Sequence, residues 1–123
     1  MLEILLRTPR GARAAARLVQ VNDELHVPHL LDVEFAQVLR RLLRIGRIDV
    51  EESERALEDL RVFPVMRHPH LPLLTRIWEL RNSVSAYDAT YVALAEALDA
   101  PLMTCDTGLS RSHGHRADIV LLT

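Results

Sequence analysis

Short apolar segments with strand character alternate with longer segments of helical periodicity along nearly the whole chain. This alternation constrains the fold most, because strands separated by helices are typical of an α/β sheet with helices on both faces. We therefore expect an α/β fold with a parallel sheet. The pattern predicts strands at about 25–27, 62–66, 101–106 and 118–123, and helices at about 11–21, 31–45, 50–60, 70–82, 85–99 and 107–112.

The composition is that of one ordinary globular domain. The chain has 123 residues, of which 49% are hydrophobic and 26% charged, enough to bury a core. The sequence has no run of about 18 apolar residues, so it predicts no membrane span. Cys105 is the only cysteine. From these two observations we expect a cytoplasmic protein. The formal net charge of -2 means that any contact with nucleic acid must be local.

Glu34 lies within an apolar helical segment. It follows Leu31 by three residues and precedes Val38 by four, so it shares their helical face and is expected to point toward the core. A charged side chain there normally needs a partner charge or a metal ion. The alternative is a place in the first helical turn, where a half-exposed carboxylate is favoured by the helix dipole.

Asp88 lies in a helix rich in alanine. Ser85 followed by Asp88 matches a capping box, so helix capping alone could explain the acid. Asp88 also shares a face with Tyr91 and Val92, which would direct it toward a neighbouring element. The two roles are compatible.

Asp106 directly follows LMTC, at the carboxyl end of a short apolar strand. In open parallel sheets, the carboxyl ends of the strands are where ligands bind, and Thr104 faces the same side two residues earlier. A cap for the helix that begins near Thr107 is the alternative role of Asp106. Taken together, Glu34, Asp88 and Asp106 predict a site for a hard cation such as Mg²⁺, which prefers oxygen ligands and often also contacts a substrate phosphate.

Two other motifs suggest different chemistry. Asp106 begins the triplet Asp-Thr-Gly found in aspartic proteases, but that chemistry requires a β-rich dimer and helices dominate here. His68 with His70, and His113 with His115, form two His-x-His pairs that could bind a transition metal. Pro69 and Gly114 separate their members, which favours loops with adventitious affinity over a structural zinc site.

The segments PHLLDVEFAQVLRRL, SAYDATYVALAEAL and PLMTCDTGLSR resemble the PIN-domain family, and closely the VapC toxins of bacterial toxin–antitoxin pairs. The resemblance covers nearly the whole chain, 1–123, as a single PIN-like domain. It implies that Glu34, Asp88 and Asp106 are acidic positions of the active site, accompanied by Thr104. The implied activity is endoribonuclease cleavage of cellular RNA that depends on Mg²⁺ or Mn²⁺. The implied partners are a VapB-type antitoxin and a second copy of the chain.

One departure from the family's pattern concerns the N-terminus. PIN toxins open with an apolar strand that ends in an Asp, whereas residues 1–6 resemble the helix that follows this strand. We therefore expect the central strand and one acidic ligand to be missing, with no strand to compensate. A late start assignment is favoured over a degenerate copy. The alternative function is that of an inactive PIN-like remnant that only binds an antitoxin.

Overall fold

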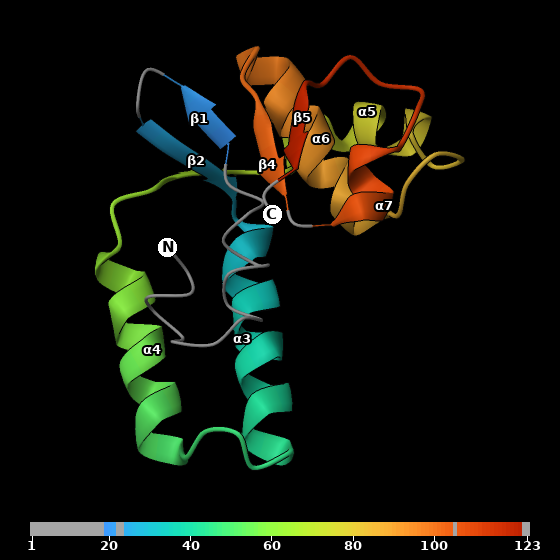
Figure 1. Cartoon of the computed structure of the whole chain (residues 1–123). Coiled ribbons are helices and arrows are strands. Elements are labelled where there is room, and N and C mark those ends of the chain that lie inside the picture. The colour runs from blue at the N-terminus through green and yellow to red at the C-terminus, as the bar shows by residue number, and fades with distance from the viewer. Residues whose placement is uncertain (1–18, 22–23, 105, 122–123) are drawn as a thin grey trace.

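The computed structural model describes residues 19–21, 24–104 and 106–121, and it has the predicted α/β architecture. A single five-stranded sheet is flanked by helices (Figure 1). The strands are β1 (Val19–Val21), β2 (Glu24–Pro28), β3 (Met66–His68), β4 (Leu102–Thr104) and β5 (Ile119–Leu121). The helices are α3 (Leu30–Arg44), α4 (Val50–Val62), the 3-10 helix η1 (Leu71–Leu73), α5 (Leu74–Glu79), α6 (Ala86–Leu98) and α7 (Thr107–Ser110).

The strand order is β3-β2-β1-β4-β5, and the strands do not all run in one direction. β2 and β3 are parallel, as are β4 and β5, but β1 is antiparallel to both β2 and β4. The predicted parallel pairing is therefore confirmed for β2–β3 and β4–β5, whereas β1 departs from it. Only two residues separate β1 from β2, and parallel neighbours would need a much longer crossover.

The centre of the sheet is occupied by β1. Val19 pairs with His26 of β2 on one side and with Leu102 of β4 on the other, and Val19 is completely buried. The sequence had suggested a helix through residue 21 and no strand to compensate at the centre of the sheet. Both expectations were wrong for residues 19–21. The rest of that predicted helix, and the helical segment predicted before it, lie outside the described residues.

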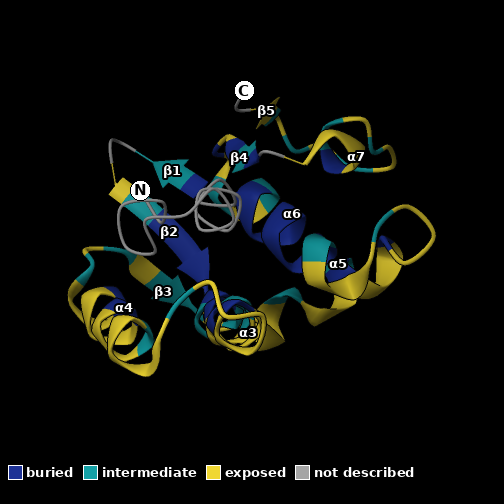
Figure 2. Cartoon of the chain, turned by 60° about the horizontal axis from the view of Figure 1, so that its bottom comes forward, coloured by how far each residue is buried: buried dark blue, intermediate teal, exposed yellow. Residues whose placement is uncertain are grey.

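Helix α6 forms the middle of the core. It contacts β1, β2 and β4, and all its residues from Ala89 to Ala95 are buried (Figure 2). Alanine at three of these seven positions lets the helix backbone come close to the sheet. This explains why one helix can approach several strands at once.

Helices α3 and α4 form a hairpin that projects from one end of the sheet (Figure 1). Leu31, Phe35 and Leu42 of α3 are buried, as their helical spacing predicts. The turn after α3 uses Gly46 at a φ of 76°, a left-handed conformation that glycine adopts at low cost. The start of α4 is fixed by a reciprocal capping box between Asp49 and its third helical residue, so both helix ends follow from local sequence.

Strand β3 lies at the sheet edge, and it begins at Met66 rather than near residue 62. In the sequence, His68 and His70 form a His-x-His motif. In the structure, His68 Nε2 lies 2.8 Å from His26 Nδ1. His26 is buried on β2, and its Nε2 is 3.4 Å from Glu24 Oε2. The two histidines therefore join the edge strand to its neighbour by a side-chain hydrogen bond.

This histidine pair predicts a loss of stability in mild acid. Burial, His26 and His29 lower the pKa of His68 below its ordinary value of 6.5. The unfolded chain therefore takes up the His68 proton first, and the free energy of unfolding falls as the pH drops below about 6.5. In urea unfolding between about pH 7.5 and 5, the free energy of unfolding of His68→Gln should fall less steeply than that of the unaltered protein. His113→Gln, at an exposed position, is the control, and equal slopes for both variants would contradict the prediction.

No helix in the described ranges is long and apolar enough to cross a membrane.

Candidate active site

Glu34 lies on α3 beyond the first helical turn, in which Asp32 is the acidic residue. The first-turn alternative was therefore wrong for Glu34. Its neighbour on the core side, Leu31, is buried and Val33 is 68% exposed, while Glu34 itself is half-buried. Its carboxylate Oε1 accepts a hydrogen bond of 2.5 Å from the hydroxyl of Tyr91 on α6. Glu34 thus faces α6, as its helical spacing predicts.

Asp88 lies in the first turn of α6 and is half-buried. Its backbone N–H donates to the side chain of Ser85, the N-cap residue, at 3.1 Å, so the capping role of Ser85 is present. Tyr91 follows Asp88 by three residues and therefore lies on the same side of the helix. Since Tyr91 reaches Glu34, the side of α6 that carries Asp88 is the side that α3 approaches.

Asp106 is exposed and forms the N-cap of α7. Its Oδ1 accepts from the N–H groups of Gly108 at 2.8 Å and Leu109 at 3.3 Å. In the part of the chain that the structure describes, no hydrogen bond uses Oδ2. The capping role considered from the sequence is confirmed, and one carboxylate oxygen is left for another partner.

Thr104 is almost completely buried at the end of β4. Its hydroxyl oxygen accepts from the backbone N–H of Asp106 at 3.0 Å. Thr104 therefore fixes the direction in which the chain leaves the strand, and with it the position of the Asp106 carboxylate. The structure brings Thr104 and Asp106 together, and it separately brings Glu34 to the side of α6 that carries Asp88.

The donor chemistry fits a hard divalent cation, since carboxylate oxygens are its usual ligands. Glu34 and Asp106 are each oriented by a hydrogen bond, as outer partners orient the ligands of metal sites. Within the described ranges, no three His, Cys, Asp or Glu side chains converge closely enough to form a metal site. Mg²⁺ does not require three, because it is commonly held by one or two carboxylates, water and substrate phosphate.

Two side chains, those of Asp32 and Tyr91, have roles that the sequence did not reveal. Asp32 accepts a hydrogen bond from Arg67 Nε of β3 at 2.9 Å, and the N-cap residue of α3 is His29. Tyr91 was seen only as part of a helical face. A signal for Tyr91 was available, because a tyrosine on a buried face usually needs a hydrogen-bond partner, although its partner 57 residues away could not be inferred.

Two substitutions of Asp106 separate its role as the N-cap of α7 from its negative charge. Asp106→Asn keeps a side-chain oxygen for the α7 N–H groups, so its free energy of unfolding should stay within about 0.5 kcal/mol of the parent value. Asp106→Ala removes that oxygen and should cost about 1 kcal/mol. Urea unfolding of the two variants checks this, and an alanine variant as stable as the asparagine variant would show that the cap contributes nothing.

The comparisons with known proteins agree with this fold. The PIN domain family model matches residues 1–113. Ribonuclease VapC9 of Mycobacterium tuberculosis is 50% identical over 95 residues, covering 77% of this chain and 75% of the relative. Ribonuclease VapC12 of the same organism is 38% identical over 121 residues, covering 98% and 92%. Ribonuclease VapC1 is 43% identical over 98 residues, covering 79% and 74%.

The family match extends over most of the chain, and three relatives above 30% identity share most of their length with it. The chain therefore belongs to the PIN-domain family and, within that family, to the VapC proteins.

Proposed function

We propose that this protein is the toxin of a type II toxin–antitoxin system and acts as a Mg²⁺-dependent endoribonuclease on cellular RNA. The observation that carries the proposal is the hydrogen bond from Tyr91 of α6 to Glu34 of α3, since Tyr91 shares a side of α6 with Asp88. Relatives named as ribonucleases support the reaction class. Mn²⁺ is the alternative cation, since it takes the same oxygen donors.

The proposed site residues act through their carboxylates. Glu34, Asp88 and Asp106 would hold the cation, with Asp106 contributing Oδ2 because its Oδ1 is bound by α7. Thr104 keeps Asp106 in place through its backbone N–H. When bound, a divalent cation neutralises charge on the phosphodiester and activates a water for attack.

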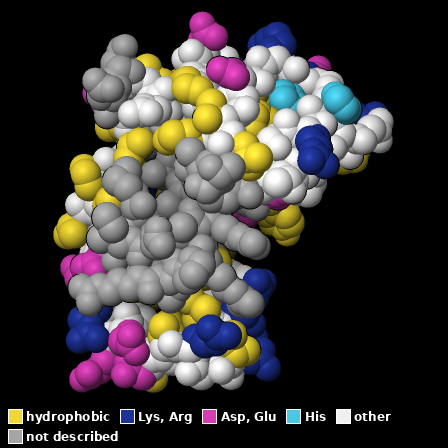
Figure 3. Space-filling model, in the orientation of Figure 1, with side chains coloured by type: hydrophobic (Ala, Val, Ile, Leu, Met, Phe, Trp, Pro, Cys, Tyr) yellow, Lys and Arg dark blue, Asp and Glu magenta, His cyan; other side chains and the backbone are white. Residues whose placement is uncertain are grey.

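Basic side chains near the end of α3 support contact with RNA. Arginine side chains, coloured dark blue, lie beside acidic side chains, coloured magenta, at the lower end of the molecule, where α3 ends and α4 begins (Figure 3). Exposed arginines at this end are Arg40, Arg41, Arg44 and Arg47. Arginine suits planar phosphate contacts. This end could therefore bind the RNA backbone although the protein as a whole is not strongly basic.

We also propose that the protein binds a partner protein through exposed apolar side chains. Exposed apolar side chains on η1 and α5 form a stripe at helical spacing, with Leu71 72%, Leu74 53% and Trp78 66% exposed. Such a stripe is typical of a protein contact, and it supports binding of a VapB-type antitoxin or a second copy of this chain. A cytoplasmic location stays a prediction.

The experiment that tests the proposed function is RNA cleavage by the purified protein, with Mg²⁺ and with EDTA. Cleavage that requires the cation and stops on chelation supports the nuclease. A folded protein that binds an antitoxin and leaves RNA intact at every Mg²⁺ concentration would instead establish the inactive, antitoxin-binding remnant.

A further inference from the structure

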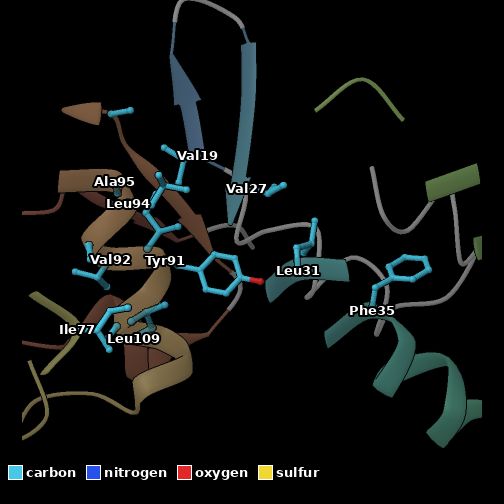
Figure 4. Close-up of a cluster of buried hydrophobic side chains, with 14 of the residues drawn as sticks. Val19, Val27, Leu31, Phe35, Ile77, Tyr91, Val92, Leu94, Ala95 and Leu109 are labelled. Atoms are coloured by element: carbon cyan, nitrogen blue, oxygen red, sulfur yellow. The ribbon is translucent and has the colours of Figure 1, made fainter. Parts of the chain in front are cut away.

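Tyr91 is a buried phenol in contact with a proposed metal ligand. Its side chain is among the largest that the fold buries completely, and its hydroxyl donates to Glu34 Oε1 at 2.5 Å. Figure 4 shows the ring inside the apolar cluster, with the hydroxyl directed toward the start of α3 near Leu31. The core therefore holds the ring, and its hydroxyl reaches Glu34 of α3.

This arrangement makes Tyr91 a rigid donor. A phenol packed in a core has few rotamers left, and its hydroxyl is costly to bury without a partner. Glu34, by contrast, has a long side chain that is only half-buried, and such a side chain otherwise samples several rotamers. A fixed donor at Oε1 restricts the carboxylate to a narrow range of positions.

We infer that Tyr91 is a positioning residue for Glu34 in the proposed metal site, an inference that rests on the proposed function. Tyr91 lies one helical turn after Asp88, so α6 supplies one proposed ligand and also the group that orients a second ligand from α3. Outer hydrogen-bond partners of this kind orient ligands and strengthen metal affinity. The hydroxyl of Tyr91 contacts the proposed ligand Glu34. Tyr91 therefore affects the cation only through Glu34.

Tyr91→Phe tests this role because it removes the hydroxyl and keeps the ring. We expect the dissociation constant for Mn²⁺, measured by titration calorimetry, to rise about 10-fold, and the Mn²⁺-induced increase in melting temperature to shrink. Tyr87→Phe is the matched control, since Tyr87 lies on the same helix and is 63% exposed. Adding Tyr91→Phe to Glu34→Gln should change Mn²⁺ affinity no further, because the carboxylate that Tyr91 orients is already gone.

A measurement on the unaltered protein does not depend on the folding of a variant. Titration with diamagnetic Mg²⁺ should shift the ring NMR resonances of Tyr91 and leave those of Tyr87 in place. Equal Mn²⁺ affinity in Tyr91→Phe and Tyr87→Phe would overturn the inference and leave the proposed metal site intact. Failure of the unaltered protein to bind Mn²⁺ would overturn the metal site and the inference with it.

Discussion

Asp88→Asn is expected to lower the rate of RNA cleavage by about 100-fold or more at saturating Mg²⁺. Loss of an outer partner of a metal ligand already costs about 10- to 100-fold, and Asp88 is proposed as a ligand itself. The change should leave the fold intact, because the bond to Ser85 uses the backbone N–H of Asp88 and asparagine is nearly the same size. The measurement is the single-turnover cleavage rate, with circular dichroism to verify folding.

Asp99→Asn is the matched control for this prediction. It makes the same carboxylate-to-amide change at the other end of α6, where Asp99 is the C-cap residue with a φ of 49°. Asparagine tolerates this left-handed conformation well, so cleavage and stability should both be retained. A folded Asp88→Asn protein that cleaves RNA as fast as Asp99→Asn would remove Asp88 from the active site.

Arg76→Met is expected to lower the free energy of unfolding by about 3 kcal/mol, near the lower end of the cost of breaking a buried ion pair. The Glu96 side chain is 2% exposed, and Arg76, which is 31% exposed, binds it through Nε at 2.7 Å and Nη2 at 3.0 Å. Arg76 also donates to the carbonyl of Gly114. The pair therefore ties α5 and α6 to the segment that leads into β5, and methionine would leave the carboxylate without its charged partner.

The same pair predicts how stability changes in acid. The hydrogen bond from Arg76 lowers the pKa of Glu96 below its ordinary value of 4.5. The pair's contribution is therefore present above about pH 4.5 and is lost as the pH falls through the folded-state pKa. Arg76→Met should weaken this acid-induced loss. Arg61→Met is the control, because the Arg61–Glu58 pair is 75% and 71% exposed and should contribute less than about 1 kcal/mol. An equal loss of unfolding free energy in Arg76→Met and Arg61→Met would contradict this role of the Arg76–Glu96 pair.

The helices of this fold could be predicted because their signals are local. Phe35 and Leu42 follow helical spacing, and Ser85 and Asp106 cap the helices that they precede, as their sequence positions suggested. These features depend on residues within one or two turns. The alternation of strands with helices was likewise sufficient for the α/β class.

The central strand could not be predicted because its context is not local. Residues 19–21 continue a segment with helical spacing, and they form a strand in the structure because Val19 is buried between β2 and β4. Tertiary pairing here overrides the local pattern. The hydrogen bond between Tyr91 and Glu34 and the Arg76–Glu96 pair also join distant positions, and one sequence does not reveal such pairs.

Glu34, Asp88 and Asp106 are proposed to hold a divalent cation together. The most direct measurement is a crystal structure of the protein with Mn²⁺, in which anomalous scattering locates the ion. We predict a peak at about 2.1 Å from carboxylate oxygens of Asp88 and at least one of Glu34 and Asp106. A Mn²⁺ peak on other residues, in a protein that cleaves RNA with that ion, would contradict the account.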